Sequence, residues 1–280
     1  KFGKNNLVRF LKKELLLSSS DSWVDKIPTI HGAIFPNTPK PDGELPPDIK
    51  PEMIIWSEDY ENLEPWIQWF SAVSGLDAKS HKLFRLGDIE DSDIDQIYEI
   101  IEKKGYKVGA ISPMNVKNKL VNPVFFIPDP WTNTEADNSF WNKKIYSAIK
   151  QSVNDNAENK ISLKNLFILS ISFLKFFRFK NIYLYLKLLV SSKKKPWNKS
   201  LFLDLFLHDI HMSLIKKDLN FSSIFLNAGA HIQHHYFYNM VNKDIKNPDW
   251  YVSKKLNPAK ELFDVYDKII GDYLKIYKEN

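Results

Sequence analysis

The stretch Ile94-Asp-Gln-Ile-Tyr-Glu-Ile-Ile-Glu-Lys-Lys-Gly-Tyr-Lys-Val-Gly-Ala-Ile111 decides the fold class, because it places an amphipathic helix directly before a buried strand. Its first part has apolar residues at helical spacing on one face: Ile94, Ile97, Tyr98 and Ile101. Gly105 is expected to end this helix near Lys104, and Tyr106 to Ile111 reads as the strand. A helix followed at once by a strand is half of a parallel βαβ unit, so the sequence predicts an α/β protein.

A second apolar run, Phe221 to Leu226, predicts another buried strand and leads into Asn227-Ala-Gly-Ala-His231-Ile-Gln-His234-His235-Tyr236. Three of the seven histidines therefore follow a strand's carboxyl end, where open α/β sheets bind ligands. Neutral imidazole is the commonest metal ligand in proteins. Helical spacing would place His231 on one face with either His234 or His235, as metal binding requires. The alternative is a polar loop with one structural imidazole.

The remaining sequence predicts one incomplete α/β domain over residues 1–280, with a mostly parallel sheet flanked by helices. Residues 140–217 are helical almost throughout and read as a helical insertion or cap. Further helices are expected at Asn5 to Leu17, from Pro65 to Gly75 and at Ala259 to Lys278, and a short strand at Met53 to Trp56. Two segments read as loop or extended chain: Pro28 to Pro51 and Asn115 to Asn133.

Composition limits the classes of function. The chain has 280 residues, of which 44% are hydrophobic, and it has ample apolar content for a packed core. It contains no cysteine, so any metal would be bound by His, Asp, Glu or Asn. The net charge of +5 is mild and the lysines are scattered, which argues against a nucleic-acid partner. The triplet Lys193-Lys194-Lys195 reads as a solvated loop.

The most hydrophobic region, Leu163 to Val190, is broken by five basic residues, so no stretch reaches the roughly 20 apolar residues that cross a bilayer. Two interpretations of this region remain. It is a pair of cap helices packed on the sheet, or it associates peripherally with an anionic membrane surface. The first residues, Lys1 to Asn6, resemble neither a signal peptide nor a transit peptide, so we expect a cytoplasmic protein, and the chain reads as a fragment of a longer one.

The segment Leu63-Glu-Pro-Trp-Ile-Gln-Trp-Phe-Ser-Ala-Val-Ser-Gly-Leu-Asp-Ala-Lys-Ser-His81 carries a family resemblance. An aromatic-rich helix followed by Ser74-Gly75-Leu76 and Ser80-His81 is similar to the alkaline phosphatase superfamily, in its nucleotide pyrophosphatase/phosphodiesterase and sulfatase-like branch. A later strand in that family ends in a run of His and aromatic residues, which the stretch from Asn227 to Tyr236 resembles. Together with the Phe126-Ile-Pro-Asp-Pro-Trp131 loop, the similarity extends over about two thirds of the chain.

The resemblance implies a metal-dependent hydrolase, or a transferase, acting on small phosphate or sulfate esters. Family members bind two divalent metals, usually zinc, and manganese is the other metal we consider. The resemblance makes His231, His234, His235 and Asn227 the candidate metal ligands. This chain departs from the family pattern at two positions. Pro65 stands where the family's nucleophile would be, and Asn227 stands where a metal-binding aspartate would be. The family's first strand with its Asp and its later Asp-His pair have no match in this chain.

Four further residues are candidates for the site. Glu64 is a candidate metal ligand or carboxylate base at a helix start, or a helix cap. His81 matches the family motif, in which it contacts substrate or orders a turn. Asp129 and Trp131 lie in a proline-framed loop that presents them to a substrate, unless Trp131 fills the core.

One more set of polar residues, Asp204, His208 and His211, falls on one helical face. These three side chains are either a metal site or, as we expect for a long amphipathic helix, a solvated polar face. Two classes of function thus remain: an esterase of the kind described, and a non-catalytic binding or scaffold protein that descends from the same fold.

Overall fold

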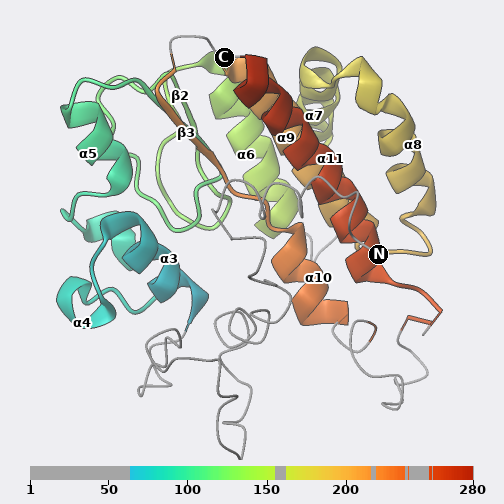
Figure 1. Cartoon of the computed structure of the whole chain (residues 1–280), viewed down its shortest axis with the longest axis horizontal. Helices are drawn as coiled ribbons and strands as arrows, with labels where there is room; N and C mark the ends of the chain where they lie inside the picture. Colours follow the sequence, from blue (N-terminus) through green and yellow to red (C-terminus); the bar gives the residue numbers. More distant parts are fainter. Residues whose placement is uncertain are drawn as a thin grey trace, which may run out of the picture.

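The computed structural model describes residues 64–154, 162–215, 219–236 and 255–279, together with 239, 252 and 253. The expected helix at Asn5 to Leu17, the strand at Met53 to Trp56 and the segment Pro28 to Pro51 lie outside these residues. Within them, the protein is α/β, with a three-stranded sheet flanked by helices (Figure 1).

The sheet is parallel throughout, with the strand order β2-β1-β3. The central strand, β1 (Val108–Ile111), is buried along its whole length, and β3 (Phe221–Ile224) is its neighbour on one side. Both strands were predicted. The other neighbour, β2 (Phe125–Ile127), falls in the segment that the sequence predicted to be loop, and this part of the prediction is wrong.

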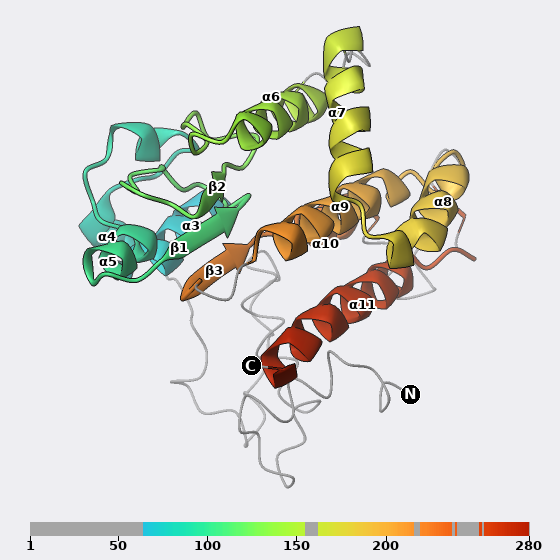
Figure 2. The ribbon, with the colours of Figure 1, turned by 90° about the horizontal axis from the view of Figure 1, so that it is seen from above.

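Helices cover both faces of the sheet, as Figure 2 shows. On one face, α5 (Ile97–Lys103) packs on β1, and α3 (Pro65–Ser74) packs on α5. On the other face, α6 (Phe140–Asn154) packs on β2 and α9 (Asn198–Leu214) on β3. The three layers arise because alternate strand residues point to opposite sides.

The remaining elements extend these layers. The short helices α4 (Ala78–His81) and η4 (Asp88–Asp91) follow α3. Between α6 and α9 lie α7 (Leu163–Phe176), η6 (Phe179–Asn181) and α8 (Ile182–Ser191). The chain then continues from β3 into α10 (Ala228–Tyr236), and later into α11 (Pro258–Glu279), which packs on both α9 and α10. No helix in the described ranges is long and apolar enough to span a membrane.

Helix ends in this structure follow their local sequence signals. The predicted glycine ends are confirmed, since Gly75 and Gly105 have φ values of 72° and 84°, which favour glycine. The helix expected from Ile94 begins instead at Ile97, because the side chains of Gln96 and Glu99 form a capping box there.

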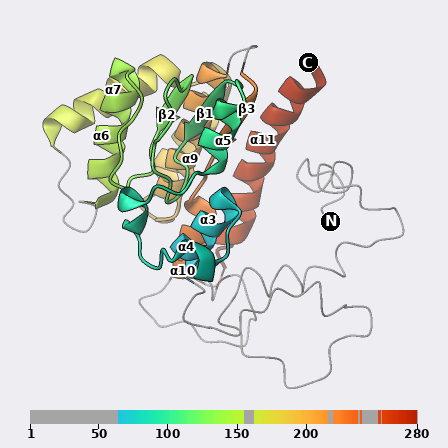
Figure 3. The ribbon, with the colours of Figure 1, turned by 90° about the vertical axis from the view of Figure 1, so that its left-hand side faces the viewer.

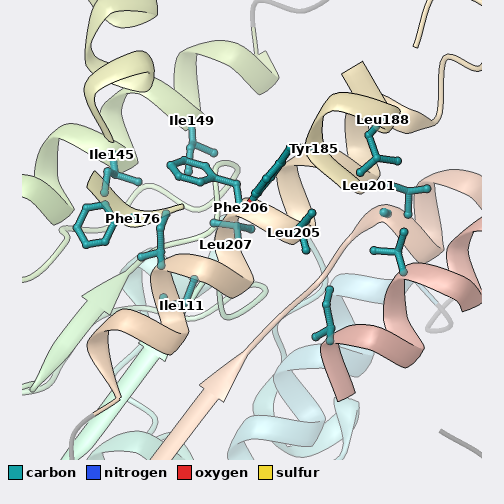
Figure 4. Close-up of a cluster of buried hydrophobic side chains, with 14 of the residues drawn as sticks. Ile111, Ile145, Ile149, Phe176, Tyr185, Leu188, Leu201, Leu205, Phe206 and Leu207 are labelled. Atoms are coloured by element: carbon teal, nitrogen blue, oxygen red, sulfur yellow. The ribbon is translucent and has the colours of Figure 1, made fainter. Parts of the chain in front are cut away.

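The larger hydrophobic core lies between the sheet and the helices of the second face. It is built around α9, which is buried on all sides from Asp204 to His211 and contributes Leu201, Leu205 and Phe206 to the core (Figure 4). Helices α6, α7 and α8 contribute Ile145, Ile149, Phe176, Tyr185 and Leu188. A smaller cluster on the first face contains Tyr98, Val108, Ala110, Val116 and Phe126. In α11, Leu262, Val265 and Ile269 are buried.

Strand register between β1 and β2 depends on a glycine. Gly109 pairs with Phe125, and the phenyl ring of Phe125 lies over the glycine. A Cβ atom at position 109 would lie 2.5 Å from the ring, and Phe125 is itself fully buried. The space that glycine leaves is therefore filled by the partner strand's aromatic ring.

Candidate functional site

The carboxyl ends of the three strands point to the end of the sheet at which α3 and α10 lie (Figures 1 and 3). Helix α10 begins four residues after β3 ends, so the histidine segment lies at the expected position. The rings of Trp69 in α3 and Phe225 after β3 make an edge contact with centroids 4.9 Å apart. This contact joins α3 to the segment that leads from β3 into α10, at one end of the sheet.

Two of the three clustered histidines are in ring contact. The ring centroids of His231 and His235 are 4.5 Å apart, one helical turn from each other along α10. His231 is half-buried, whereas His234 and His235 are exposed. Burial lowers the pKa of His231, and the neighbouring charges of His235 and His234 lower it further. His231 is therefore neutral at pH 7, which is the form that binds metals.

The first turn of α10 is capped by side chains from other helices. The carboxylate of Asp204, in α9, accepts hydrogen bonds from the backbone N–H groups of Asn227 at 3.1 Å and Ala228 at 2.8 Å. The Tyr266 hydroxyl of α11 donates to Asp204 at 2.7 Å and accepts from the Gly229 N–H at 3.2 Å. Three amides that have no partner within α10 are thus satisfied from α9 and α11, which fixes the start of the histidine helix.

The prediction that Asp204, His208 and His211 form a solvated face is wrong, because none of the three is more than 3% exposed, and they are covered by α10, α11 and β3. They do not converge on one point either. His208 contacts Asp272 at 3.1 Å, and His211 contacts the hydroxyls of Tyr273 and Ser222. All three side chains join α9 to α11, and Asp204 and His211 also reach the start of α10 and β3, respectively.

Glu64 lies at the start of α3, in the N-cap position, and is exposed. Its side chain makes no capping hydrogen bond, and its backbone carbonyl accepts from Ile67 N–H at 3.0 Å. Pro65 occupies the first turn, as predicted. The carboxylate is therefore not used for a hydrogen-bonded cap.

His81 is buried and is held by its surroundings through both ring nitrogens. Its Nδ1 accepts from the Leu83 N–H at 3.0 Å, so Nε2 carries the proton and donates to the Ser71 hydroxyl at 2.9 Å. Burial lowers its pKa. In this arrangement His81 connects α3 with the turn that follows α4, which is the turn-ordering role considered from the sequence.

Asp129 is fully buried directly after β2, and its carboxylate organises the surrounding loops. It accepts hydrogen bonds from the N–H groups of Asn115, Trp131 and Thr132 and from the Thr132 hydroxyl, at 2.7–3.0 Å. Burial raises its pKa. Trp131 is half-buried beside it.

Two polar residues after β1 were not singled out from the sequence. Ser112 and Asn115 have φ values of 53° and 52°, which are uncommon for residues other than glycine. The Asn115 amide donates to the Trp66 carbonyl of α3 at 3.0 Å, while its own N–H donates to Asp129. Asn115 thus ties the ends of β1 and β2 to α3, and only the unusual backbone of these residues signals this role.

A metal site would draw on the histidines of α10. The described residues contain no group of three or more His, Asp or Glu side chains arranged to hold a metal. They supply one neighbouring imidazole pair, His231 and His235, with the amide of Asn227 in the residue before the helix. The pair is chemically suited to zinc or manganese, and a complete zinc site needs at least one more protein ligand.

The comparisons with known proteins add no family assignment. The chain matches no protein-family model, and no curated protein or solved structure is significantly similar to it.

Proposed function

We propose that the protein is a metal-dependent hydrolase, or a transferase using the same chemistry, that acts on small phosphate or sulfate esters in the manner of the alkaline phosphatase superfamily. The observation that carries this proposal is the His231–His235 ring contact on a helix that starts at the carboxyl end of β3. The sequence resemblance supplies the reaction class. The adjacency of α3 to this end of the sheet supports it, because the family's reacting groups come from both segments.

The chain's own residues have distinct tasks in this proposal. His231 and His235 bind the metal through their imidazole nitrogens, with His234 and Asn227 as further candidate ligands. Asp204 and Tyr266 hold the first turn of α10, so the imidazoles are positioned before a ligand arrives. A bound zinc or manganese ion would neutralise charge on the transferring phosphoryl or sulfuryl group. Glu64 is the carboxylate available at the start of α3 for proton transfer.

Metal content and ester hydrolysis test the proposal together. Purified protein should contain zinc or manganese by elemental analysis and should hydrolyse p-nitrophenyl phosphate, bis-p-nitrophenyl phosphate or p-nitrophenyl sulfate. The variants His231→Ala/His234→Ala and His231→Ala/His235→Ala separate the two possible pairs. We expect the second to lose metal more completely, since its rings are in contact.

The position of Asn227 offers a gain-of-function control. Asn227→Asp should raise zinc affinity, by roughly tenfold or more, because a carboxylate binds a dication better than an amide does. Asn138→Asp introduces the same charge at an exposed position and should leave zinc affinity unchanged. Unchanged metal content in both double histidine variants would eliminate the histidine site, and metal-free protein without esterase activity would favour the binding or scaffold alternative.

A further inference from the structure

The outer faces of α7 and α8 expose an unusual amount of apolar surface. Nine large hydrophobic side chains of this region are exposed: Leu163, Leu166, Phe167, Leu174, Phe179, Tyr183, Leu186, Leu189 and Val190. Four of them are at least 77% exposed. Eight of them recur at helical spacing on α7 and α8 and form two outward stripes, and Phe179 lies in η6 between the two helices. We call this set of nine residues the α7–α8 apolar surface.

These two helices lie at the periphery of the molecule. Helix α7 packs on α6 and α9, and α8 packs on α9, which leaves their other sides outward. Figures 1 and 2 both place α8 at the opposite side of the molecule from α5. The buried positions of α8, Tyr185 and Leu188, account for its inward contacts. Internal packing therefore does not explain the outward stripes.

The charge around the apolar surface has one sign. Residues 162–203 contain nine basic side chains and no acidic one: Lys164, Lys175, Arg178, Lys180, Lys187, Lys193, Lys194, Lys195 and Lys199. Asp272 and Glu261 of α11 pair with Arg178, Lys180 and Lys195. The other six form no ion pair within the described part of the chain, and all six are exposed.

We propose that the α7–α8 apolar surface docks on the surface of an anionic lipid bilayer. Apolar side chains on two short helices would enter the interfacial region, while the surrounding lysines contact acidic headgroups. Helix α7 has 14 residues and α8 has 10, fewer than the roughly 20 that cross a bilayer, so the helices lie along the interface. The aromatic side chains of Phe179 and Tyr183 suit the interfacial region.

The charge distribution favours this occupant over a second copy of the chain. Self-association through this face would bring two sets of unpaired lysines together, and like charges at an interface oppose association. The apolar stripes also distinguish a membrane surface from nucleic acid, which is bound through basic residues along a phosphate backbone. The proposal does not depend on the esterase function, because it uses none of the residues of the candidate site.

Vesicle flotation tests the proposal directly. The 280-residue chain should float with vesicles of phosphatidylcholine mixed equally with phosphatidylglycerol, and should not float with pure phosphatidylcholine. Phe167→Ser/Val190→Ser should lower the bound fraction about tenfold, because two apolar anchors are lost. Lys187→Glu/Lys194→Glu should lower the bound fraction by a similar factor, and this loss should be larger at low salt, where charges are screened less.

Matched controls use exposed side chains outside the surface. Val121→Ser/Phe140→Ser removes two exposed apolar residues elsewhere, and Lys82→Glu/Lys104→Glu changes two exposed lysines elsewhere; both variants should bind vesicles as the unchanged chain does. Far-ultraviolet circular dichroism confirms that each variant is folded. Absence of vesicle binding overturns the proposal. So does a dimer, detected by light scattering, that Phe167→Ser/Val190→Ser abolishes, since the surface would then bind a second copy.

Discussion

At the scale of single residues, Asp204 is the most consequential side chain near the histidines. It is buried in α9, yet it satisfies two backbone amides at the start of a helix that begins 24 residues later in the chain. A carboxylate that accepts backbone N–H groups at a helix start normally belongs to that helix's own N-cap residue. Here the cap comes from another element, so the position of His231 depends on how α9 and α10 pack.

Removing this cap should therefore be costly. We expect Asp204→Ala to lower the free energy of unfolding by about 2–4 kcal/mol, because it leaves the Asn227 and Ala228 amides and the Tyr266 hydroxyl without their acceptor. Tyr266→Phe should cost about half as much, since the Asp204 bonds to α10 remain. Urea unfolding measures both values. Equal losses in the two variants would contradict the capping role.

The same residues show what sequence analysis reaches and where it stops. Helical spacing correctly placed Asp204, His208 and His211 on one face, but it holds no information about what covers that face. Burial by α10, α11 and β3 turned an expected solvated face into interior contacts. The histidine pairing was also left open by the sequence, because helical spacing allowed either His234 or His235 to lie beside His231. In the structure the ring of His235 contacts that of His231.

At the scale of elements, periodicity and glycine ends located α3, α5, β1, β3 and α11 well. The strand that was missed, β2, has three residues and stands between Pro123 and Pro128, so its local sequence reads as loop. Its strand character comes from pairing with β1, a contact between distant residues that no local pattern records. The helical character of the segment between β2 and β3 was likewise recognisable from the sequence. The elements against which those helices pack were not.

Pairing between β1 and β2 predicts the effect of one small substitution. Gly109→Ala should lower the free energy of unfolding by about 1–3 kcal/mol, because the new methyl group meets the buried Phe125 ring. Adding Phe125→Leu should recover part of the loss. Gly229→Ala is the matched control, since a Cβ there meets nothing closer than 3.7 Å. Thermal unfolding of the four proteins checks this, and a Gly109→Ala variant as stable as the unchanged chain would refute it.

At the scale of the whole molecule, two buried groups give opposite pH dependences. Burial, followed by the charge of His208, lowers the pKa of His211 from 6.5 to about 3, so its contribution to stability is lost as pH falls through that range. Burial raises the pKa of Asp204 from 3.8 to about 6, so its contribution is present below pH 3.8 and is lost as pH rises to 6. Between pH 3.8 and about 6 the pH dependences of stability that come from Asp204 and His211 therefore cancel.

Variants should separate the two contributions. Relative to the unchanged chain, Asp204→Asn should lose about 1.4 kcal/mol of stability for each unit of pH decrease between pH 6 and 4, as His211 then acts alone. His211→Gln should show the reverse slope, because only the Asp204 contribution remains. Urea midpoints across this pH range give both slopes. Parallel curves for all three proteins would show that neither group titrates as described.

Because Asp204 of α9 caps α10, the order in which the two helices fold is constrained. Helix α10 has nine residues, too few for a stable isolated helix, and the acceptor for its first amides arrives only when α9 docks. Its helical structure should therefore form late, after the large helical core has assembled around α9. The imidazole pair would then be among the last features of the molecule to take shape and among the first to be lost when α9 and α10 separate.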